Sequence, residues 1–191
     1  MADLFARGER PEYLFWVGCA GAFDDRYKKV VRAFAKILVH LKVSFAVLGK
    51  EETCTGDPAR RGGNEMLYQM QALQLIERLK AYEVRKIITI CPHCYNIFKN
   101  EYPDLDGKFE VINYLQLLNK YAEEGLLKFD PASLKNITVT YHDPCYLGRA
   151  CLLYTSDAAD DLLCVDLGGR RIIKKKTTSI LHHQCTRAHT Y

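Results

Sequence analysis

The alternation of short apolar runs with amphipathic stretches constrains the fold of this chain more than any other feature. Four runs have the length and composition of β-strands, at residues 13–19 (YLFWVGC), 44–49 (SFAVLG), 86–92 (KIITICP) and 109–113 (FEVIN). The stretches between them carry apolar residues at helical spacing. Strands that alternate with helices are typical of βαβ units, so the sequence predicts an α/β fold with a mostly parallel sheet.

The expected helices place this sheet between two helical layers. Asp24 or Asp25 can cap the first helix, Asn64 can cap the second, and a third begins near Pro92 and ends before Pro103. Their predicted buried sides are Val30, Phe34, Ile37, Leu38 and Leu41 in the first helix and Leu67, Met70, Ile76 and Leu79 in the second. A fourth helix follows at 114–125, and residues 136–143 (NITVTYHD) predict a fifth strand. This order is typical of a three-layer Rossmann-like or flavodoxin-like fold.

Four cysteines follow strands of this predicted sheet. Cys19 and Cys91 end the first and third strands, Cys54 lies in the turn-rich loop after the second, and Cys94 is in the helical turn after Cys91. The carboxyl ends of parallel strands meet at one edge, which is where open α/β sheets bind ligands. We therefore expect the four thiols to converge there, where helix N-termini stabilise thiolates.

Cysteine usage points to metal or redox chemistry. Eight cysteines occur in a chain whose N-terminus lacks the basic-then-apolar layout of a signal peptide. In a reducing compartment, spaced thiols are more often metal ligands or redox centres than disulfides. The CPHC motif at Cys91 and Cys94 could hold zinc, carry an iron–sulfur cluster or exchange disulfides. Structural zinc sites usually have two close pairs, and a disulfide exchanger would leave Cys19 and Cys54 idle.

Composition excludes several other classes of protein. The net charge of +4 is small and is not gathered in a basic stripe, so a nucleic-acid partner is not predicted. The apolar runs are too short to span a bilayer, and the chain is expected to be cytoplasmic. The first strand-to-helix turn reads GCAGAF and lacks the GxGxxG of a dinucleotide site.

The last part of the chain differs from natural protein sequence. Residues 151–176 (CLLYTSDAADDLLCVDLGGRRIIKKK) follow no helical or strand period and resemble a translated sequencing adapter that runs into poly-A. We therefore interpret 151–191 as a non-native tail and set its cysteines and histidines aside. Residues 1–150 then carry 21 basic and 19 acidic side chains.

A weak internal repeat suggests how residues 1–150 are organised. A β-rich run ending in cysteine occurs at LFWVGC and again at TVTYHDPC, which ends at Cys145. We expect a leader at 1–12 that is internal to a longer protein, a first cysteine-rich domain at 13–135, and the start of a second copy at 136–150. Cys145 would then be a ligand of a second, incomplete site.

Four motifs in order carry a family resemblance: WVGC, ETCTGDPARRGGNE, CPHCYNIFKNEYP and HDPCYLGR. They resemble the cysteine-rich, or CCG, domain of iron–sulfur oxidoreductases. This family includes the B and D components of heterodisulfide reductase and the iron–sulfur subunits of glycolate oxidase, lactate utilisation and anaerobic glycerol-3-phosphate dehydrogenase. The resemblance implies a [4Fe-4S] cluster on Cys19, Cys54, Cys91 and Cys94. It also implies electron transfer with a flavin dehydrogenase or a ferredoxin-like module as partner, and an association with the inner face of the membrane through such partners.

One position departs from the pattern of the resemblance. The family has paired cysteines in its middle motif, whereas this chain has Thr55 after Cys54, which leaves four thiolates for an ordinary cubane cluster. His93 is expected to support the site rather than bind metal, because iron–sulfur clusters favour thiolate. Arg60 and Arg61 either lie near the cluster or are simply solvated.

Overall fold

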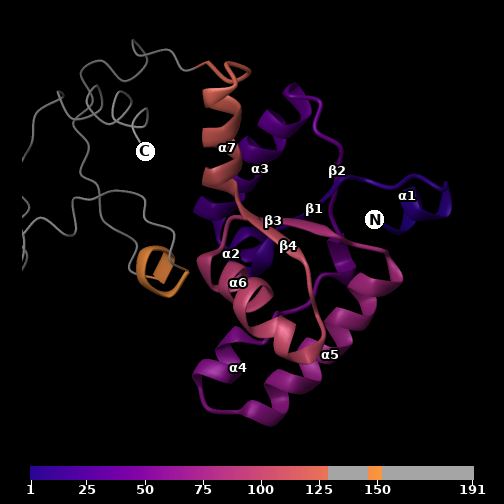
Figure 1. Ribbon diagram of the computed structural model, residues 1–191, viewed down its shortest axis with the longest axis vertical. Helices are drawn as coiled ribbons and strands as arrows, with labels where there is room; N and C mark the ends of the chain where they lie inside the picture. Colours follow the sequence, from indigo (N-terminus) through magenta and orange to yellow (C-terminus); the bar gives the residue numbers. More distant parts are fainter. Residues whose placement is uncertain (129–145, 152–191) are drawn as a thin grey trace, which may run out of the picture. The chain divides into compact units, whose positions relative to one another are not determined.

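The computed structural model describes residues 1–128 and 146–151 (Figure 1). The part from Met1 to Lys128 is one compact unit. Its sheet has four strands, β1 (Tyr13–Trp16), β2 (Phe45–Ala46), β3 (Lys86–Thr89) and β4 (Glu110–Asn113), which pair in parallel in the order β2-β1-β3-β4. The predicted α/β class is confirmed, and the order matches the first four strands of a flavodoxin-like sheet.

Alternation along β1 gives the sheet two buried faces. Leu14 and Trp16 belong to one hydrophobic cluster, and Tyr13 and Phe15 belong to a second one. All four side chains are at most 5% exposed. Because successive side chains of a strand point to opposite faces, a fully apolar strand requires cover on both sides.

Long helices provide this cover and form the outer layers (Figure 1). Helices α3 (Asp25–His40) and α7 (Tyr114–Glu123) pack on the cluster of Tyr13 and Phe15. Helix α5 (Glu65–Ala81) packs on the other face with α6 (Pro92–Asn96), a π-helix (Ile97–Glu101) and a 3-10 helix (Tyr102–Leu105). The side chains of Asp24 and Asn64 cap α3 and α5, as predicted.

Short helices that the sequence did not predict connect these elements: α1 (Ala2–Ala6), α2 (Gly18–Phe23), a 3-10 turn (Gly49–Glu51) and α4 (Asp57–Arg61). Helix α2 lies directly on α3, because a Cβ at Gly21 would come within 2.7 Å of the Val31 side chain. The expected leader 1–12 packs against the domain, with the Met1 amine donating to the Val47 carbonyl at 2.8 Å.

The predicted buried sides of the two long helices were partly wrong. In α3, Phe34 and Leu38 are buried but Val30 is 39% exposed. In α5, Leu67 and Met70 are 42% and 51% exposed. The core side of α5 is formed by Tyr68, Ala72, Leu75, Ile76 and Leu79.

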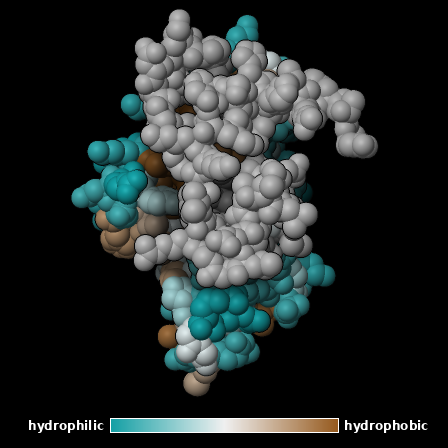
Figure 2. Space-filling model, turned by 90° about the vertical axis from the view of Figure 1, so that its left-hand side faces the viewer, coloured by the Kyte–Doolittle hydropathy of each residue, from teal (hydrophilic) through white to brown (hydrophobic). Residues whose placement is uncertain are grey.

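The error in α5 has a simple physical reason. Apolar residues occur all around this helix, so periodicity alone does not single out the buried side. At the lower end of Figure 2, where α4 and α5 lie in Figure 1, isolated hydrophobic residues stand on a mainly hydrophilic surface.

The helical segment after β3 also differs from the prediction. Helical backbone continues past Pro103 as the 3-10 helix Tyr102–Leu105. Proline fits there because a first-turn residue needs no N–H donor inside the helix.

The second described segment, residues 146–151, belongs to a separate unit of the chain. Tyr146–Ala150 form a π-helical turn, which the Cys151 N–H closes by donating to the Tyr146 carbonyl at 3.0 Å. The predicted fifth strand and Cys145 lie outside the described residues, as do most of the second copy and all of the tail after Cys151. Within residues 1–128 and 146–151, no helix is long and apolar enough to cross a membrane.

Candidate metal centre

Cys91 and Cys94 lie together at the carboxyl end of β3. Cys91 is the N-cap of α6 and Cys94 is in its first turn, so both thiols lie on the same side of the helix start. A hydrogen bond from Cys94 lowers the pKa of the Cys91 thiol, and the N–H groups of Cys94 and His93 act in the same direction. The same hydrogen bond and burial raise the pKa of Cys94. The pair therefore contains one thiol that ionises readily, as metal ligands and nucleophiles must.

The position of this pair in the sheet is the one expected for a ligand site. From β1 the chain proceeds to β2 on one side of the sheet and then to β3 on the other. The gap between the ends of β1 and β3 is therefore the topological switch point, where open α/β sheets bind ligands. Cys19 follows β1 and Cys91 follows β3, so both flank this point.

The segment of Cys19 reaches the pair through its backbone. Gly18 has a φ of +74°, which favours glycine. A Cβ at Gly18 would lie 3.7 Å from the Cys94 sulfur and 3.8 Å from the Cys91 Cβ. The Cys19 side chain itself is exposed. The turn after β1 thus passes directly over the cysteine pair.

The segment of Cys54 reaches the pair through Thr55. This side chain is buried, and its hydroxyl donates to the Cys94 sulfur at 3.9 Å. Cys54 is an exposed residue, and its sulfur accepts from the Gly56 N–H at 3.4 Å. The Tyr102 hydroxyl donates to the Thr55 carbonyl at 2.9 Å, which fixes the loop that contains Cys54 and Thr55. Burial raises the pKa of Tyr102, so this hydroxyl stays a donor.

The structure brings together only part of the predicted ligand set. Cys91 and Cys94 are in contact, and Gly18 and Thr55, the neighbours of Cys19 and Cys54, touch them. In the described ranges, no three Cys, His, Asp or Glu side chains are close enough together to hold a metal ion. Cys19 and Cys54 are exposed residues next to the two residues that contact the pair.

One buried donor next to the pair fits a sulfur-rich ligand. The Trp16 indole nitrogen is buried without a hydrogen-bond partner of ordinary geometry among the described residues. It nevertheless acts on the Cys94 thiol and, like the Thr55 hydroxyl, opposes the rise in its pKa. A buried N–H without an oxygen acceptor is costly, whereas a thiolate or inorganic sulfide beside it would accept this hydrogen bond.

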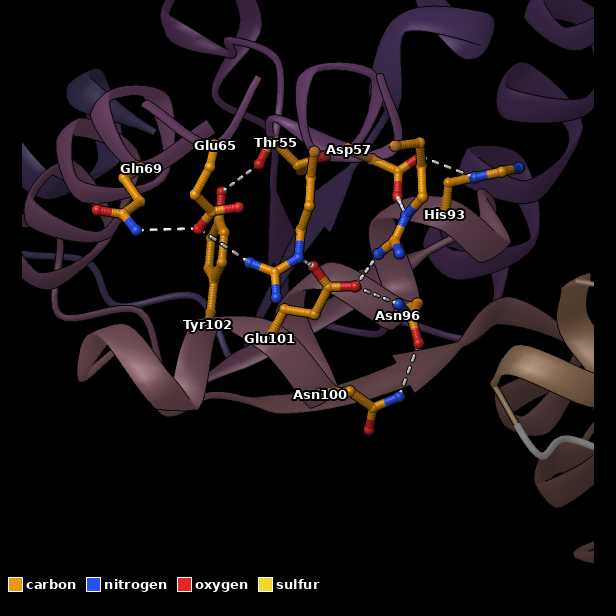
Figure 3. A network of polar contacts seen from close by, with 11 residues as sticks. Thr55, Asp57, Glu65, Gln69, His93, Asn96, Asn100, Glu101 and Tyr102 are labelled. Carbon is orange, nitrogen blue, oxygen red and sulfur yellow. Dashed lines mark hydrogen bonds and ion pairs between the residues drawn. The ribbon is translucent and has the colours of Figure 1, made fainter. Parts of the chain in front are cut away.

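A polar network holds the Cys54 loop to the helix that carries Cys94 (Figure 3). Glu101, whose side chain is only 11% exposed, pairs with Arg61 and lies 2.6 Å from the Arg60 guanidinium. Asn96 also donates to Glu101 at 2.8 Å. Of the two predicted alternatives for Arg60 and Arg61, neither describes them fully. Both are ion-paired with Glu101 across the two segments, and both remain partly exposed.

His93 takes part in the same network as an orienting residue. Its ring Nδ1 lies 2.9 Å from the buried Asp57 carboxylate, which also accepts from Arg61 at 3.2 Å. The ring is half-exposed. Asp57 thus holds the histidine beside the cysteine pair at the start of α6.

A second connection runs from the Cys54 loop to the Cys19 turn. The Glu52 carboxylate accepts from the Gly18 N–H at 2.6 Å and the Val17 N–H at 3.2 Å. Burial raises the pKa of Glu52, and the two hydrogen bonds oppose that rise. The sequence did not predict Glu52, Asp57 or Glu101 as site residues. Glu52 and Asp57 lie in a turn-rich loop that has no period from which burial can be inferred, and Glu101 lies in the helical segment Ile97–Glu101, where its partner Arg61 is 40 residues away in the chain.

The fold and the paired thiols define an α/β domain with cysteine side chains at its ligand-binding edge. Residues 13–99 match the CCG family of cysteine-rich domains. This confirms the resemblance to the cysteine-rich domain, and the domain formed by these residues belongs to that family.

Curated relatives support the same assignment. The chain is 49% identical over 142 residues to "EtfAB:quinone oxidoreductase" of Syntrophomonas wolfei, covering 74% of this chain and 20% of the relative. It is 46% identical over 147 residues to "Probable iron-sulfur-binding oxidoreductase FadF" of Bacillus subtilis, covering 77% and 21%. It is 32% identical to one component of the dihydromethanophenazine:CoB--CoM heterodisulfide reductase of Methanosarcina barkeri, covering 74% and 35%.

The chain thus spans about a fifth of the length of the first two relatives. No solved structure matches it.

Proposed function

We propose that this domain is an electron-transfer module that holds one [4Fe-4S] cluster on Cys19, Cys54, Cys91 and Cys94. When bound, such a cluster accepts and releases single electrons. The relatives named above are called iron–sulfur-binding proteins, oxidoreductases or reductases, which supports this class of function.

The observation that carries the proposal is the contact of three cysteine-bearing segments at one sulfur atom. Cys91 is hydrogen-bonded to Cys94 within its own segment, Gly18 approaches the Cys94 sulfur from the first, and Thr55 donates to it from the second. Cys19 and Cys54 each adjoin one of these contacting residues. Rotation of two exposed side chains toward the pair would complete a set of four thiolates.

The surrounding residues would bind and tune the cluster. The Trp16 N–H and the Thr55 hydroxyl are donors to sulfur, and such hydrogen bonds raise the reduction potential of iron–sulfur centres. The missing side chain at Gly18 leaves room beside the Cys94 sulfur. Asp57 and Glu101 hold the segment that carries Cys54 against the segment that carries Cys91 and Cys94, through their contacts with His93 and Arg60.

Anaerobic reconstitution tests the proposal directly. The purified chain should take up about four iron and four sulfide per molecule. Replacing either Cys19 or Cys54 by serine should lower this content, because both are ligands. One bound zinc without sulfide would contradict the proposal and support a zinc-stabilised domain instead.

A thiol–disulfide oxidoreductase is the second candidate, favoured by the lowered pKa of Cys91. In that reaction the Cys91 thiolate attacks a substrate disulfide, and Cys94 then resolves the mixed disulfide and releases the reduced substrate. Such a site needs neither Cys19 nor Cys54. Disulfide-reductase activity that persists in a Cys19→Ser, Cys54→Ser double variant would support this candidate over the cluster.

We further propose that a redox partner docks over the rim formed by Cys19 and Phe23. Phe23 follows Cys19 by one helical turn on α2 and is 82% exposed. The adjoining helix α3 carries five cations and a single acid, Asp25. A flavin dehydrogenase or a ferredoxin-like module with an acidic surface would fit this rim. A cytoplasmic location, with membrane association through such partners, stays a prediction.

A further inference from the structure

Glu52 links two cysteine-bearing segments that are remote in sequence. Its carboxylate accepts hydrogen bonds from the backbone of Val17 and Gly18, at 3.2 and 2.6 Å. Gly18 directly precedes Cys19, and Glu52 precedes Cys54 by two residues. One side chain therefore ties together the turn that presents Cys19 and the loop that presents Cys54.

The two hydrogen bonds hold a turn that lacks a capping side chain of its own. Val17 is the N-cap of α2 and makes no side-chain cap contact. A local cap would be supplied by Ser, Thr, Asp or Asn at this position. Here a distant glutamate accepts the free N–H groups instead, so the cap is also a connection between loops.

The same turn determines where Cys19 lies relative to the cysteine pair. Gly18 has a positive φ and lies against Cys91 and Cys94. Because Cys19 is the next residue, a rotation of the Gly18 peptide would move its thiol across the rim. Holding the N–H groups of Val17 and Gly18 fixes the peptide that precedes Gly18 and so restricts this rotation.

Glu52 and its neighbour Glu51 differ in their hydrogen-bond partners. Glu52 is partly buried, and no cation pairs with it among residues 1–128. Glu51 instead accepts from the Tyr82 hydroxyl at 2.6 Å, away from the cysteine segments. Burying a carboxylate that is hydrogen-bonded only to neutral donors costs free energy. This cost indicates that the carboxylate has a structural role in joining the two segments.

We propose that Glu52 is a positioning residue that holds the Cys19 turn against the Cys54 loop, so that both thiolates reach the centre formed at Cys91 and Cys94. This inference rests on the proposed function and assigns a role to a side chain outside the ligand set. Loss of the carboxylate should leave Cys91 and Cys94 in contact, but the turn that carries Cys19 should become more mobile. Removing a nearby negative charge should also favour the reduced cluster and shift its potential to more positive values.

The test compares Glu52→Gln with Glu51→Gln in the full chain. After reconstitution, the half-life of bound iron against a chelator should fall roughly tenfold or more in E52Q, as expected for a lost hydrogen bond to a charged acceptor. The midpoint potential should become more positive in E52Q. Both values should stay at the wild-type level in E51Q.

Two results would overturn the inference. One is equal iron half-lives and potentials in the two variants. The other is a fall in iron half-life in E52Q that merely parallels a fall in the thermal midpoint of the apoprotein, with an unchanged potential, since that describes structural damage only.

A failure of the proposed function would look different. If the wild-type chain takes up no iron, the cluster assignment is wrong, and the role of Glu52 is decided in the apoprotein. There, in a Cys94→Ser background that removes the competing Cys91–Cys94 disulfide, the diamide-driven disulfide between Cys19 and Cys91 should form roughly tenfold more slowly in E52Q than in E51Q. Equal rates would exclude a positioning role for Glu52.

Discussion

Gly18 is the residue whose replacement separates the stability of the domain from the assembly of its site. A Gly18→Ala variant should lose about 1–2 kcal/mol of unfolding free energy, because alanine is disfavoured at a positive φ. Gly8→Ala is the matched control, since Gly8 has a φ of +76° but no atom within 4 Å of an added Cβ. Urea denaturation should give similar losses for both variants.

The two glycine variants should differ in metal binding. The new methyl group at position 18 would lie 3.7 Å from the Cys94 sulfur, in the space beside the pair. Iron content after reconstitution should therefore fall in Gly18→Ala and stay at the wild-type level in Gly8→Ala. Equal iron contents would show that the space next to Gly18 is not used by the ligand.

The Cys91 thiol should react at lower pH than an ordinary cysteine. The thiolate fraction rises as pH increases through the pKa, so a lowered pKa moves the onset of alkylation to lower pH. Replacing Cys94 by alanine removes the main cause of the lowering and should move the onset back up. Iodoacetamide labelling of the apoprotein, followed by peptide mass spectrometry, measures both profiles, and identical profiles would contradict the assigned hydrogen bond.

At the level of elements, the Cys54 loop is held to the π-helix after α6 by Glu101. A Glu101→Gln variant leaves Arg60 and Arg61 without their shared carboxylate and should cost about 1.5–3 kcal/mol of unfolding free energy, as for lost hydrogen bonds to a charged group, because Glu101 is nearly buried but both arginines are partly solvated. Glu65→Gln is the control, because Glu65 is 55% exposed and pairs with Arg60 at 3.5 Å. It should cost about 0–1 kcal/mol. Chemical denaturation measures the unfolding free energy of both variants. Equal losses would mean that the Glu101 ion pairs do not stabilise the contact between the Cys54 loop and the π-helix.

The elements themselves show what a sequence can reveal. The strands, the caps Asp24 and Asn64 and the shared edge of Cys19 and Cys91 follow from local patterns of apolar and turn residues. Glu52 could not be predicted as a site residue, because its partners are backbone groups of a distant turn and leave no trace in the pattern. The buried side of α5 was misassigned at Met70, since apolar residues surround that helix.

For the whole molecule, the rim around Cys19 should govern exchange with a protein partner. Phe23→Ala should slow reduction by an acidic ferredoxin roughly tenfold, as for an interface residue that contributes strongly to binding. Reduction by dithionite should be unaffected, because a small reductant needs no docking surface. Val39→Ala, at the far end of α3 and 66% exposed, is the control.

Added salt should slow electron exchange with an acidic partner. The cations of α3 attract an acidic partner through solvent, and added salt screens such attraction over about 10 Å at 0.1 M. Stopped-flow rates with the ferredoxin should therefore decrease as salt rises. Rates that are independent of both salt and Phe23 would place the docking surface elsewhere.

The anchoring of the Cys54 loop by Glu101 has a consequence for biogenesis. Glu101 follows Cys94 in the chain, so a ribosome has synthesised all four cysteines before it makes the carboxylate that fastens the Cys54 loop. Strand β4, which completes the sheet beside β3, emerges later still. Iron delivered during translation would meet sulfur ligands that are not yet held in place, whereas iron delivered after chain release would meet loops that Glu101 has already fastened. We therefore expect cluster insertion into such a protein to follow the synthesis of the whole domain.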